Sequence, residues 1–161
     1  MEIERKFLIT RLPFELSDLK YADIIQFYLT DEGISPERRI RQASRSGESK
    51  YYLTEKNIGG MIREEIETEI SCEEYLRLKA SAVTCGVEKT RYFIPLDNKL
   101  TAELDVYRGS LSGLVTVEVE FGSSDEALAF SSPSWFGNEI TDDKRYKNRS
   151  LALRGLPVNH G

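Results

Sequence analysis

Apolar and charged side chains alternate along most of this chain with a period of two, which predicts β-strands. Near the start, Glu2, Glu4 and Lys6 fall on one side of such a strand, and Ile3 and Phe7 fall on the other. The same alternation recurs in seven later segments that are bounded by turn residues. We therefore predict eight strands, at residues 1–9, 23–30, 36–43, 50–57, 61–70, 87–96, 99–108 and 114–121.

Helical spacing of apolar residues appears in the intervening segments. Ser71 is followed three residues later by Glu74, the pattern of a capping box, and predicts a helix that runs to about residue 84. Gly86 follows near the expected C-terminal cap. Further helices are predicted at residues 12–20, 124–130 and 142–153, the last capped by Thr141 or Asp142. Strands and helices together give an α+β fold.

Length and composition are those of one folded domain. The chain has 161 residues, of which 40% are hydrophobic and 30% are charged, so it can bury a core and is too polar for a membrane protein. No stretch approaches the ~20 consecutive apolar residues of a membrane helix. We expect one domain over residues 1–155 and a tail at 156–161. The charged first residues lack the pattern of a secretory signal, so we expect a cytoplasmic protein.

Charge and residue counts narrow the chemistry. The net charge of −5 disfavours a general nucleic-acid or anionic-membrane surface. His160 is the only histidine, which argues against histidine-centred catalysis and zinc. Cys72 and Cys85 are expected to be free thiols. A metal would therefore be a hard cation that Asp and Glu hold.

The charged faces of the strands form an unusual set, because most strands favour one sign. Same-sign neighbours two residues apart lie about 6–7 Å from each other along a strand, and they repel unless opposite charge lies between them. Seven cations and nine acids follow this pattern: Lys6, Arg39, Arg41, Lys56, Arg63, Lys89 and Arg91, with Glu2, Glu4, Glu65, Glu67, Glu69, Glu103, Asp105, Glu118 and Glu120.

A closed antiparallel barrel would direct all of these side chains into one lumen. There a polyanion would satisfy the cations and a divalent metal would satisfy the acids. The pattern therefore predicts a site for a metal–oligophosphate complex.

The same segments resemble the CYTH family, also called triphosphate tunnel metalloenzymes. Residues 2–6, Glu-Ile-Glu-Arg-Lys, are similar to the family's N-terminal ExExK signature. The similarity continues in order along essentially the whole chain, through segments 36–42, 52–56, 63–67, 87–92, 102–105, 117–120 and 140–148. ExExK alone is a weak signal, whereas the ordered set is specific.

This resemblance implies a closed eight-stranded antiparallel β-barrel, a tunnel with helices packed outside, that binds a triphosphate lengthwise with Mg²⁺ or Mn²⁺. Short single-domain bacterial members are most similar to inorganic triphosphatases, so we expect metal-dependent hydrolysis of inorganic triphosphate. The expected binding partner of the protein is then a small molecule rather than a nucleic acid or a membrane. Homodimers are common in the family, but the sequence shows no dimer motif and leaves the oligomeric state open.

Roles for individual residues follow from the resemblance and from donor chemistry. We expect metal binding by Glu2, Glu4, Glu118 and Glu120, with Glu103 and Asp105 either holding a second metal or orienting lysines. Arg63 either binds phosphate or forms a structural ion-pair ladder with Glu65 and Glu67. The remaining expected phosphate ligands are Lys6, Arg39, Arg41, Lys56, Lys89 and Arg91.

Catalysis would consist mainly of positioning and charge neutralisation around an attacking water. The expected catalytic residues are Glu4, Glu118 and Glu120, with Lys89 assisting and selecting the phosphate that is attacked. Two other functions remain open. One is an organic triphosphatase, acting on nucleoside or thiamine triphosphate, or a class IV adenylate cyclase. The other is a polyphosphate-binding module without turnover.

Overall fold

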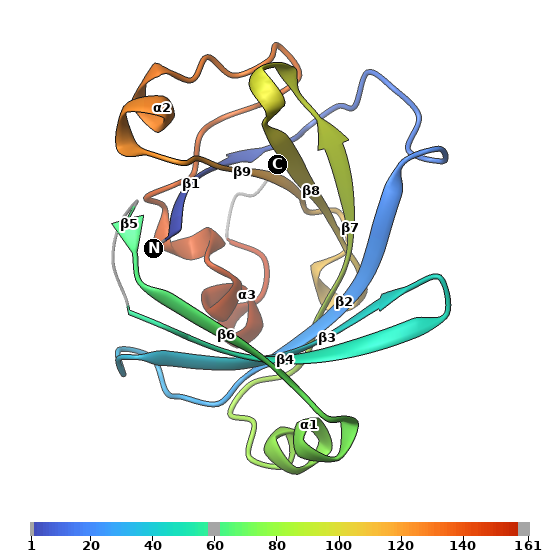
Figure 1. Ribbon diagram of the computed structural model, residues 1–161, viewed down its shortest axis with the longest axis vertical. Coiled ribbons are helices and arrows are strands. Elements are labelled where there is room, and N and C mark those ends of the chain that lie inside the picture. Colours follow the sequence, from blue (N-terminus) through green and yellow to red (C-terminus); the bar gives the residue numbers. More distant parts are fainter. Residues whose placement is uncertain (1, 58–61, 158–161) are drawn as a thin grey trace.

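The strands form a single, strongly curled antiparallel sheet around a central space (Figure 1). A computed structural model describes residues 2–57 and 62–157 of the chain. Each predicted strand is present there, with small shifts of its ends. The strands are β1 (Glu2–Leu8), β2 (Lys20–Tyr28), β3 (Glu37–Arg45), β4 (Glu48–Lys56), β5 (Ile62–Arg63), β6 (Glu65–Ile70), β7 (Val87–Pro95), β8 (Thr101–Tyr107) and β9 (Val115–Glu120).

The sheet is an open half-barrel, so the prediction of a closed eight-stranded barrel is wrong. Its strand order is β5-β1-β9-β8-β7-β2-β3-β4-β6, and β5 and β6 are its two edges. The segment predicted as one strand at 61–70 is divided at Glu64. Its first part pairs with β1 and its second part pairs with β4. The two edges are therefore joined by the chain at Glu64 and not by a ladder of hydrogen bonds.

Two of the three described α-helices pack on the outside of the sheet, as predicted. They are α1 (Cys72–Lys79), which contacts β3 and β4, and α2 (Ser124–Ala129), which contacts β1. Ser71 caps α1 by accepting a hydrogen bond from the Glu74 amide at 3.1 Å, which confirms Ser71 as the N-cap, whereas the Glu74 carboxylate binds Arg77. The third helix, α3 (Asn148–Arg154), differs, because its first residues face the interior of the curl.

Three helix predictions are corrected. Residues 12–20 form no helix. The segment runs as bends and turns, and it packs Leu12, Leu16 and Leu19 against the core although their spacing resembles that of a helix. The helix predicted at 142–153 is interrupted by the extended backbone of Lys147, which separates a 3₁₀ turn at Lys144–Tyr146 from α3. Helix α1 ends at Ala80, well before Gly86. A Cβ on that glycine would lie 3.0 Å from the Phe27 ring, so Gly86 allows a close approach.

The main core lies between the outer face of β1, β8 and β9 and the segment that contains α2. It includes Phe7, Leu104, Val117 and Val119 with Phe136, and all of them are buried. A second apolar cluster packs Tyr107, Leu114 and Ile140 against α3. None of the described helices has the length and apolarity needed to cross a membrane.

Strand β1 shows how the alternation divides the two faces of the sheet. The outer face buries Ile3 and Phe7 in the core, and Arg5 lies between them. The Arg5 guanidinium binds the Glu139 carboxylate at 2.7 and 2.9 Å, and it donates to the carbonyl oxygens of Ala127 at 2.8 Å and Phe130 at 3.1 Å. Arg5 therefore fastens the C-terminal segment to β1 from outside.

Candidate active site

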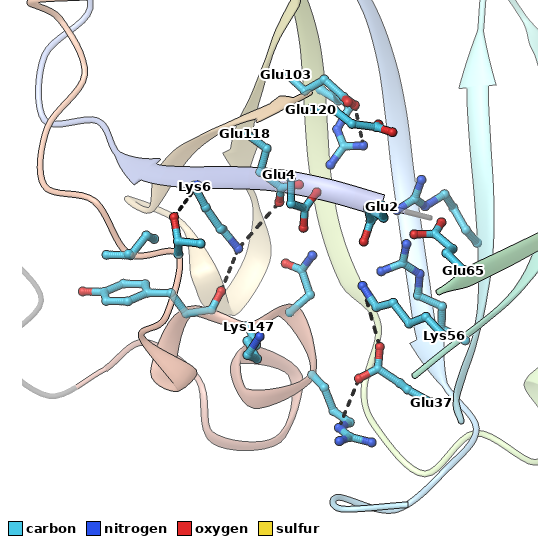
Figure 2. Close-up of a pocket in the computed structure, with 18 of the residues that line it drawn as sticks. Glu2, Glu4, Lys6, Glu37, Lys56, Glu65, Glu103, Glu118, Glu120 and Lys147 are labelled. Atoms are coloured by element: carbon cyan, nitrogen blue, oxygen red, sulfur yellow. Dashed lines mark hydrogen bonds and ion pairs between the residues drawn. The ribbon is translucent and has the colours of Figure 1, made fainter. Parts of the chain in front are cut away.

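A cavity of about 250 Å³ lies within the curl of the sheet, and its lining is mostly charged (Figure 2). It brings together ten of the predicted site residues, from six strands. They are Glu2, Glu4, Lys6, Arg39, Arg41, Lys56, Arg91, Glu103, Glu118 and Glu120. The period-two alternation produces this arrangement, because residues i and i+2 of each strand face the same side.

Acidic side chains gather where β1, β8 and β9 are neighbours. The strand register places Glu4 opposite Glu120, and it places Glu118 between Lys6 and Glu103. Burial and the nearby carboxylates of Glu2, Glu103 and Glu118 raise the pKa of Glu120. Burial alone would also raise the pKa of Glu118, but Lys6 and other cations lower it well below its usual range. This side of the cavity therefore carries more negative charge than its own cations neutralise.

The acidic residues fit a hard divalent cation by their chemistry. Carboxylate oxygens are the ligands that Mg²⁺ takes, together with phosphate oxygens and water. The Glu4 side chain contributes to the lowered pKa of Glu118, and the Glu2 side chain contributes to the lowered pKa of Glu65, so the carboxyl groups of each pair lie close together. Carboxyl groups lie this close only when a proton or a cation offsets their repulsion. As the side chains stand, no three acidic, His or Cys residues of the described chain converge on one point.

Basic side chains line the cavity from β3, β4 and β7. Burial, with the nearby charges of Arg39 and Arg91, lowers the pKa of Arg41 to about 10. The Nε atoms of Arg39 and Arg41 are buried, and the described residues offer them no hydrogen-bond partner. An unsatisfied buried donor destabilises the folded state, and an anion that accepted hydrogen bonds from both groups would remove that cost. The arrangement favours binding of a polyanion.

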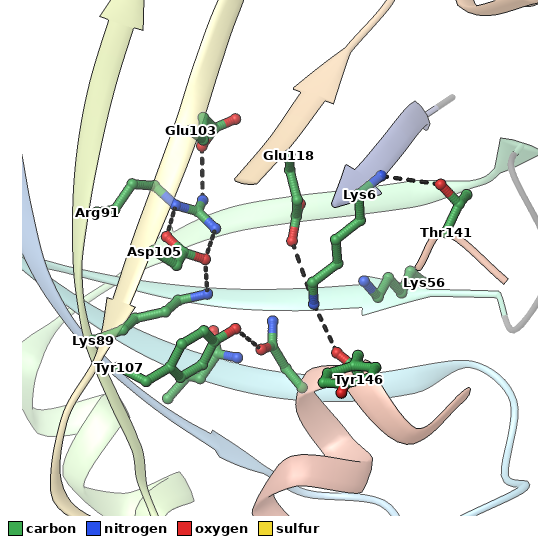
Figure 3. A network of polar contacts seen from close by, with 12 residues as sticks. Lys6, Lys56, Lys89, Arg91, Glu103, Asp105, Tyr107, Glu118, Thr141 and Tyr146 are labelled. Atoms are coloured by element: carbon green, nitrogen blue, oxygen red, sulfur yellow. Dashed lines mark hydrogen bonds and ion pairs between the residues drawn. The ribbon is translucent and has the colours of Figure 1, made fainter. Parts of the chain in front are cut away.

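Behind the cavity wall, a buried ion-pair network supports Arg91 (Figure 3). The Asp105 carboxylate accepts hydrogen bonds from Arg91 Nε at 2.8 Å and Nη2 at 2.9 Å, and from Lys89 Nζ at 2.8 Å. Arg91 Nη1 also lies 2.8 Å from Glu103. Lys89 and Asp105 are fully buried and do not line the cavity.

This placement changes two expected roles. Asp105 faces two cations, so in this arrangement its carboxylate orients Lys89 and Arg91, one of its two expected roles, and is not open to a metal. Burial, with the charges of Arg91 and Arg41, lowers the pKa of Lys89 to about 7 despite Asp105. Lys89 lies within the wall rather than at a position for direct contact with substrate.

The cavity also includes residues that the sequence reasoning left out. Glu37 lies on the same face of β3 as Arg39 and Arg41, so the alternation could have revealed it. The segment at 140–149 supplies Thr141, Asp143 and Arg149, together with Tyr146, Lys147 and Asn148. Their spacing has no period of two, so the alternation did not place them at the site, although all of them except Arg149 lie in segment 140–148 of the family resemblance.

Hydrogen bonds hold this C-terminal segment against β1 and β8. Lys6 Nζ donates to the Tyr146 carbonyl oxygen at 2.7 Å, and the Lys6 amide donates to Thr141 Oγ1 at 3.0 Å. The Tyr107 hydroxyl donates to Asn148 Oδ1 at 2.6 Å. Lys6 therefore links the segment to the acidic side of the cavity, where its Nζ lies 3.8 Å from Glu118.

The predicted Arg63–Glu69 face is described only in part. Arg63 belongs to β5, but its side chain lies outside the described part of the structure. Glu65 and Glu67 line the cavity beside the basic strands, and Glu67 accepts a hydrogen bond from Thr54 at 3.3 Å. Glu69 is not part of the lining.

Two curated proteins match the chain along nearly its whole length. An inorganic triphosphatase from Nitrosomonas europaea is 45% identical over 152 residues, which cover 94% of this chain and 97% of the relative. An inorganic triphosphatase from Acetivibrio thermocellus is 32% identical over 154 residues, which cover 93% of this chain and 92% of the relative. No family model matches the sequence.

Solved structures agree with these relatives. A crystal structure of an inorganic triphosphatase has a TM-score of 0.69 and 41% sequence identity, covering 98% of this chain and 97% of its own. A putative adenylyl cyclase from Hippeastrum, described as having a dominant triphosphatase activity, has a TM-score of 0.57. It is 18% identical and covers 80% of this chain and 83% of its own, so it supports the fold alone.

Proposed function

The chain belongs to the inorganic triphosphatase family, and from this premise we propose that it hydrolyses inorganic triphosphate in the charged cavity. The observation that carries the proposal is the concentration of five carboxylates of the lining on β1, β8 and β9, the acidic side, and of four cations on β3, β4 and β7, the basic side. A linear polyanion bound with a divalent cation matches both sides. An anion alone would match only the basic one.

We further propose that the chain is a member of the CYTH family. The ordered motifs of the sequence support this assignment, since the ExExK residues Glu2, Glu4 and Lys6 all line the cavity together with Arg39 and Arg41 of the third strand. A scattered placement of these side chains on the outer surface would have removed the basis for it.

Substrate binding falls to the basic side. Arg39, Arg41 and Arg91 offer planar groups with several donors, which suit phosphate oxygens, and Lys56 and Lys6 add point charges. The buried Nε atoms of Arg39 and Arg41 gain partners when phosphate oxygens arrive. Asp105 holds Arg91 from behind, so its guanidinium meets the substrate already oriented.

Glu2, Glu4, Glu118 and Glu120 are the residues that would hold Mg²⁺ or Mn²⁺. The cation, when bound, neutralises phosphate charge and lowers the pKa of a coordinated water. Glu120, whose pKa is raised by burial and by its acidic neighbours, is suited to accept the proton of the attacking water. Water attacks a phosphorus atom, a phosphoanhydride bond breaks, and the products are diphosphate and phosphate.

A single assay tests the proposal. The purified protein is incubated with tripolyphosphate or ATP, in Mg²⁺, Mn²⁺ or EDTA, and phosphate, diphosphate and cyclic AMP are measured. We expect metal-dependent phosphate release from tripolyphosphate, and none in EDTA. Cyclic AMP from ATP would instead identify a cyclase, preferred hydrolysis of ATP an organic triphosphatase, and tight binding of tripolyphosphate without release a binding module.

A further inference from the structure

Arg149 lines the cavity from the C-terminal helix α3, whereas most of the other charged lining residues lie on strands. It occupies the first turn of α3, is 8% exposed and lines the cavity with Lys147 and Asn148. Its Nη1 atom donates to the Asp31 carbonyl oxygen at 3.1 Å. Its Nε atom lies 3.4 Å from Glu37 Oε1. Contacts of the Nη1 and Nε atoms thus hold the guanidinium in place in the cavity lining.

The ion pairs of Glu37 are long compared with the structural ion pairs of the same protein. Glu37 lies 3.4 Å from Arg149 and 4.0 Å from Lys56, whereas the Arg91–Asp105 contacts measure 2.8 and 2.9 Å. Charge-assisted hydrogen bonds between such groups are about 2.7–2.9 Å long when they are fully formed. Glu37 therefore balances the charge of Arg149 without a fully formed hydrogen bond, and the Arg149 guanidinium keeps the capacity to bind another anion.

The surroundings of Arg149 also limit what can bind beside it. The side chains of Tyr146, Lys147 and Asn148 share this part of the lining, and the Lys6–Tyr146 and Tyr107–Asn148 hydrogen bonds keep the segment in place. A cavity of about 250 Å³ is below the roughly 300–1,000 Å³ of sites that hold drug-sized ligands. Space beside Arg149 suits a phosphate group better than a phosphate that carries an organic substituent.

We infer that Arg149 binds a terminal phosphate of the substrate and makes the site selective for a triphosphate whose ends are both unsubstituted. The inference rests on the proposed function. A free terminal phosphate presents three oxygens and more negative charge than an esterified one. An ester at this end would replace an oxygen that Arg149 binds and would press its organic group against the C-terminal segment.

The test compares R149A and R149K with a matched control, R154A. Arg154 lies on the same helix, and it is exposed and pairs with Glu32 outside the cavity. For R149A we expect the KM for tripolyphosphate to rise about 10- to 100-fold, the usual effect of losing a hydrogen bond to a charged group. R149K, which keeps the charge, should recover part of this loss, and R154A should match the wild type. The ratio of kcat/KM for ATP to that for tripolyphosphate should rise in R149A.

E37Q separates contact with substrate from a merely structural role. It removes the ion pair but leaves the Arg149 charge in the cavity, so its KM for tripolyphosphate should not rise. An equal rise in E37Q and R149A would show that Arg149 acts only as a tether and would overturn the inference. An R149A enzyme with wild-type KM and substrate ratio would overturn it as well.

Two further measurements keep the outcome decisive. If R149A does not fold, R149Q retains an amide donor for the Asp31 carbonyl and should show the same rise in KM. Turnover of tripolyphosphate by the wild type tests the proposed function separately. If there is no turnover, calorimetric titration of tripolyphosphate into the wild type and R149A still measures the contact, and equal affinities would refute it.

Discussion

Asp105→Asn tests whether the buried network behind the cavity wall holds the fold together. The wild-type carboxylate is fully buried and accepts hydrogen bonds from Lys89 and Arg91. The amide removes the negative charge and leaves Lys89 and Arg91 without the carboxylate that pairs with both. Breaking a buried ion pair by removing one partner costs about 3–5 kcal/mol of unfolding free energy. At about 2–4 °C per kcal/mol for a chain of this length, Tm should fall by roughly 6–20 °C.

The pKa of Asp105 gives an independent magnitude. Burial alone would raise this pKa, but Arg91 and Lys89 lower it from 3.8 to about 2. At about 1.4 kcal/mol per pH unit, the difference corresponds to stability on the order of 2 kcal/mol. Because the folded-state pKa is the lower one, this stability is present above pH 3.8 and is lost as the pH falls towards 2. The variant has no such carboxylate, so the wild-type advantage should shrink by about 1 kcal/mol between pH 7 and pH 3.

Urea unfolding followed by circular dichroism at pH 7 and pH 3 measures both effects. Asp23→Asn is the control, because Asp23 lies on β2 of the same sheet and pairs with Arg108 at 3.8 Å while both side chains are about half exposed. Exposed pairs contribute about 0–1 kcal/mol, so this variant should unfold almost as the wild type does. If Asp105→Asn lost no more stability than Asp23→Asn, the reasoning about the buried network would be refuted.

Two other substitutions test the two sides of the cavity. Arg39→Ala should raise the KM for tripolyphosphate far more than it lowers Tm, because the Arg39 Nε atom is buried without a partner among the residues that the structure describes; an unchanged KM would count against a phosphate contact. The double variant Glu118→Ala, Glu120→Ala should lose metal-dependent hydrolysis and keep its far-ultraviolet circular dichroism spectrum, and full activity in this variant would refute the proposed metal ligands.

The strands and their inward faces could be predicted from sequence because a period of two is a local property. Glu118 and Glu120 share a face in any regular strand, and so do Arg39 and Arg41. The capping box at Ser71 is local in the same sense. Each of these predictions needed only neighbours in the chain, and the structure confirms the shared faces.

Predictions that depended on contacts between residues far apart in the sequence were less accurate. Leu12, Leu16 and Leu19 have helical spacing, yet the segment that packs them against the core consists of bends and turns. The burial of Lys89 follows from Asp105, which lies sixteen residues away on another strand. The extended backbone at Lys147, which brings Arg149 to the cavity, has no signal in the sequence, because neither proline nor glycine marks it. The division at Glu64 depends on pairing with β1 and β4, which are far from each other in the chain.

Arg5 has a consequence for how activity screens of the N-terminal motif are interpreted. Its neighbours Glu4 and Lys6 face the cavity, whereas Arg5 anchors the opposite side of β1 to Glu139 and to two carbonyl oxygens. A library scored by activity would place all three among the intolerant positions. Scoring the same library for abundance as well would separate them, because damage at Arg5 would deplete the protein itself, while damage at Glu4 would leave a well-populated but inert molecule.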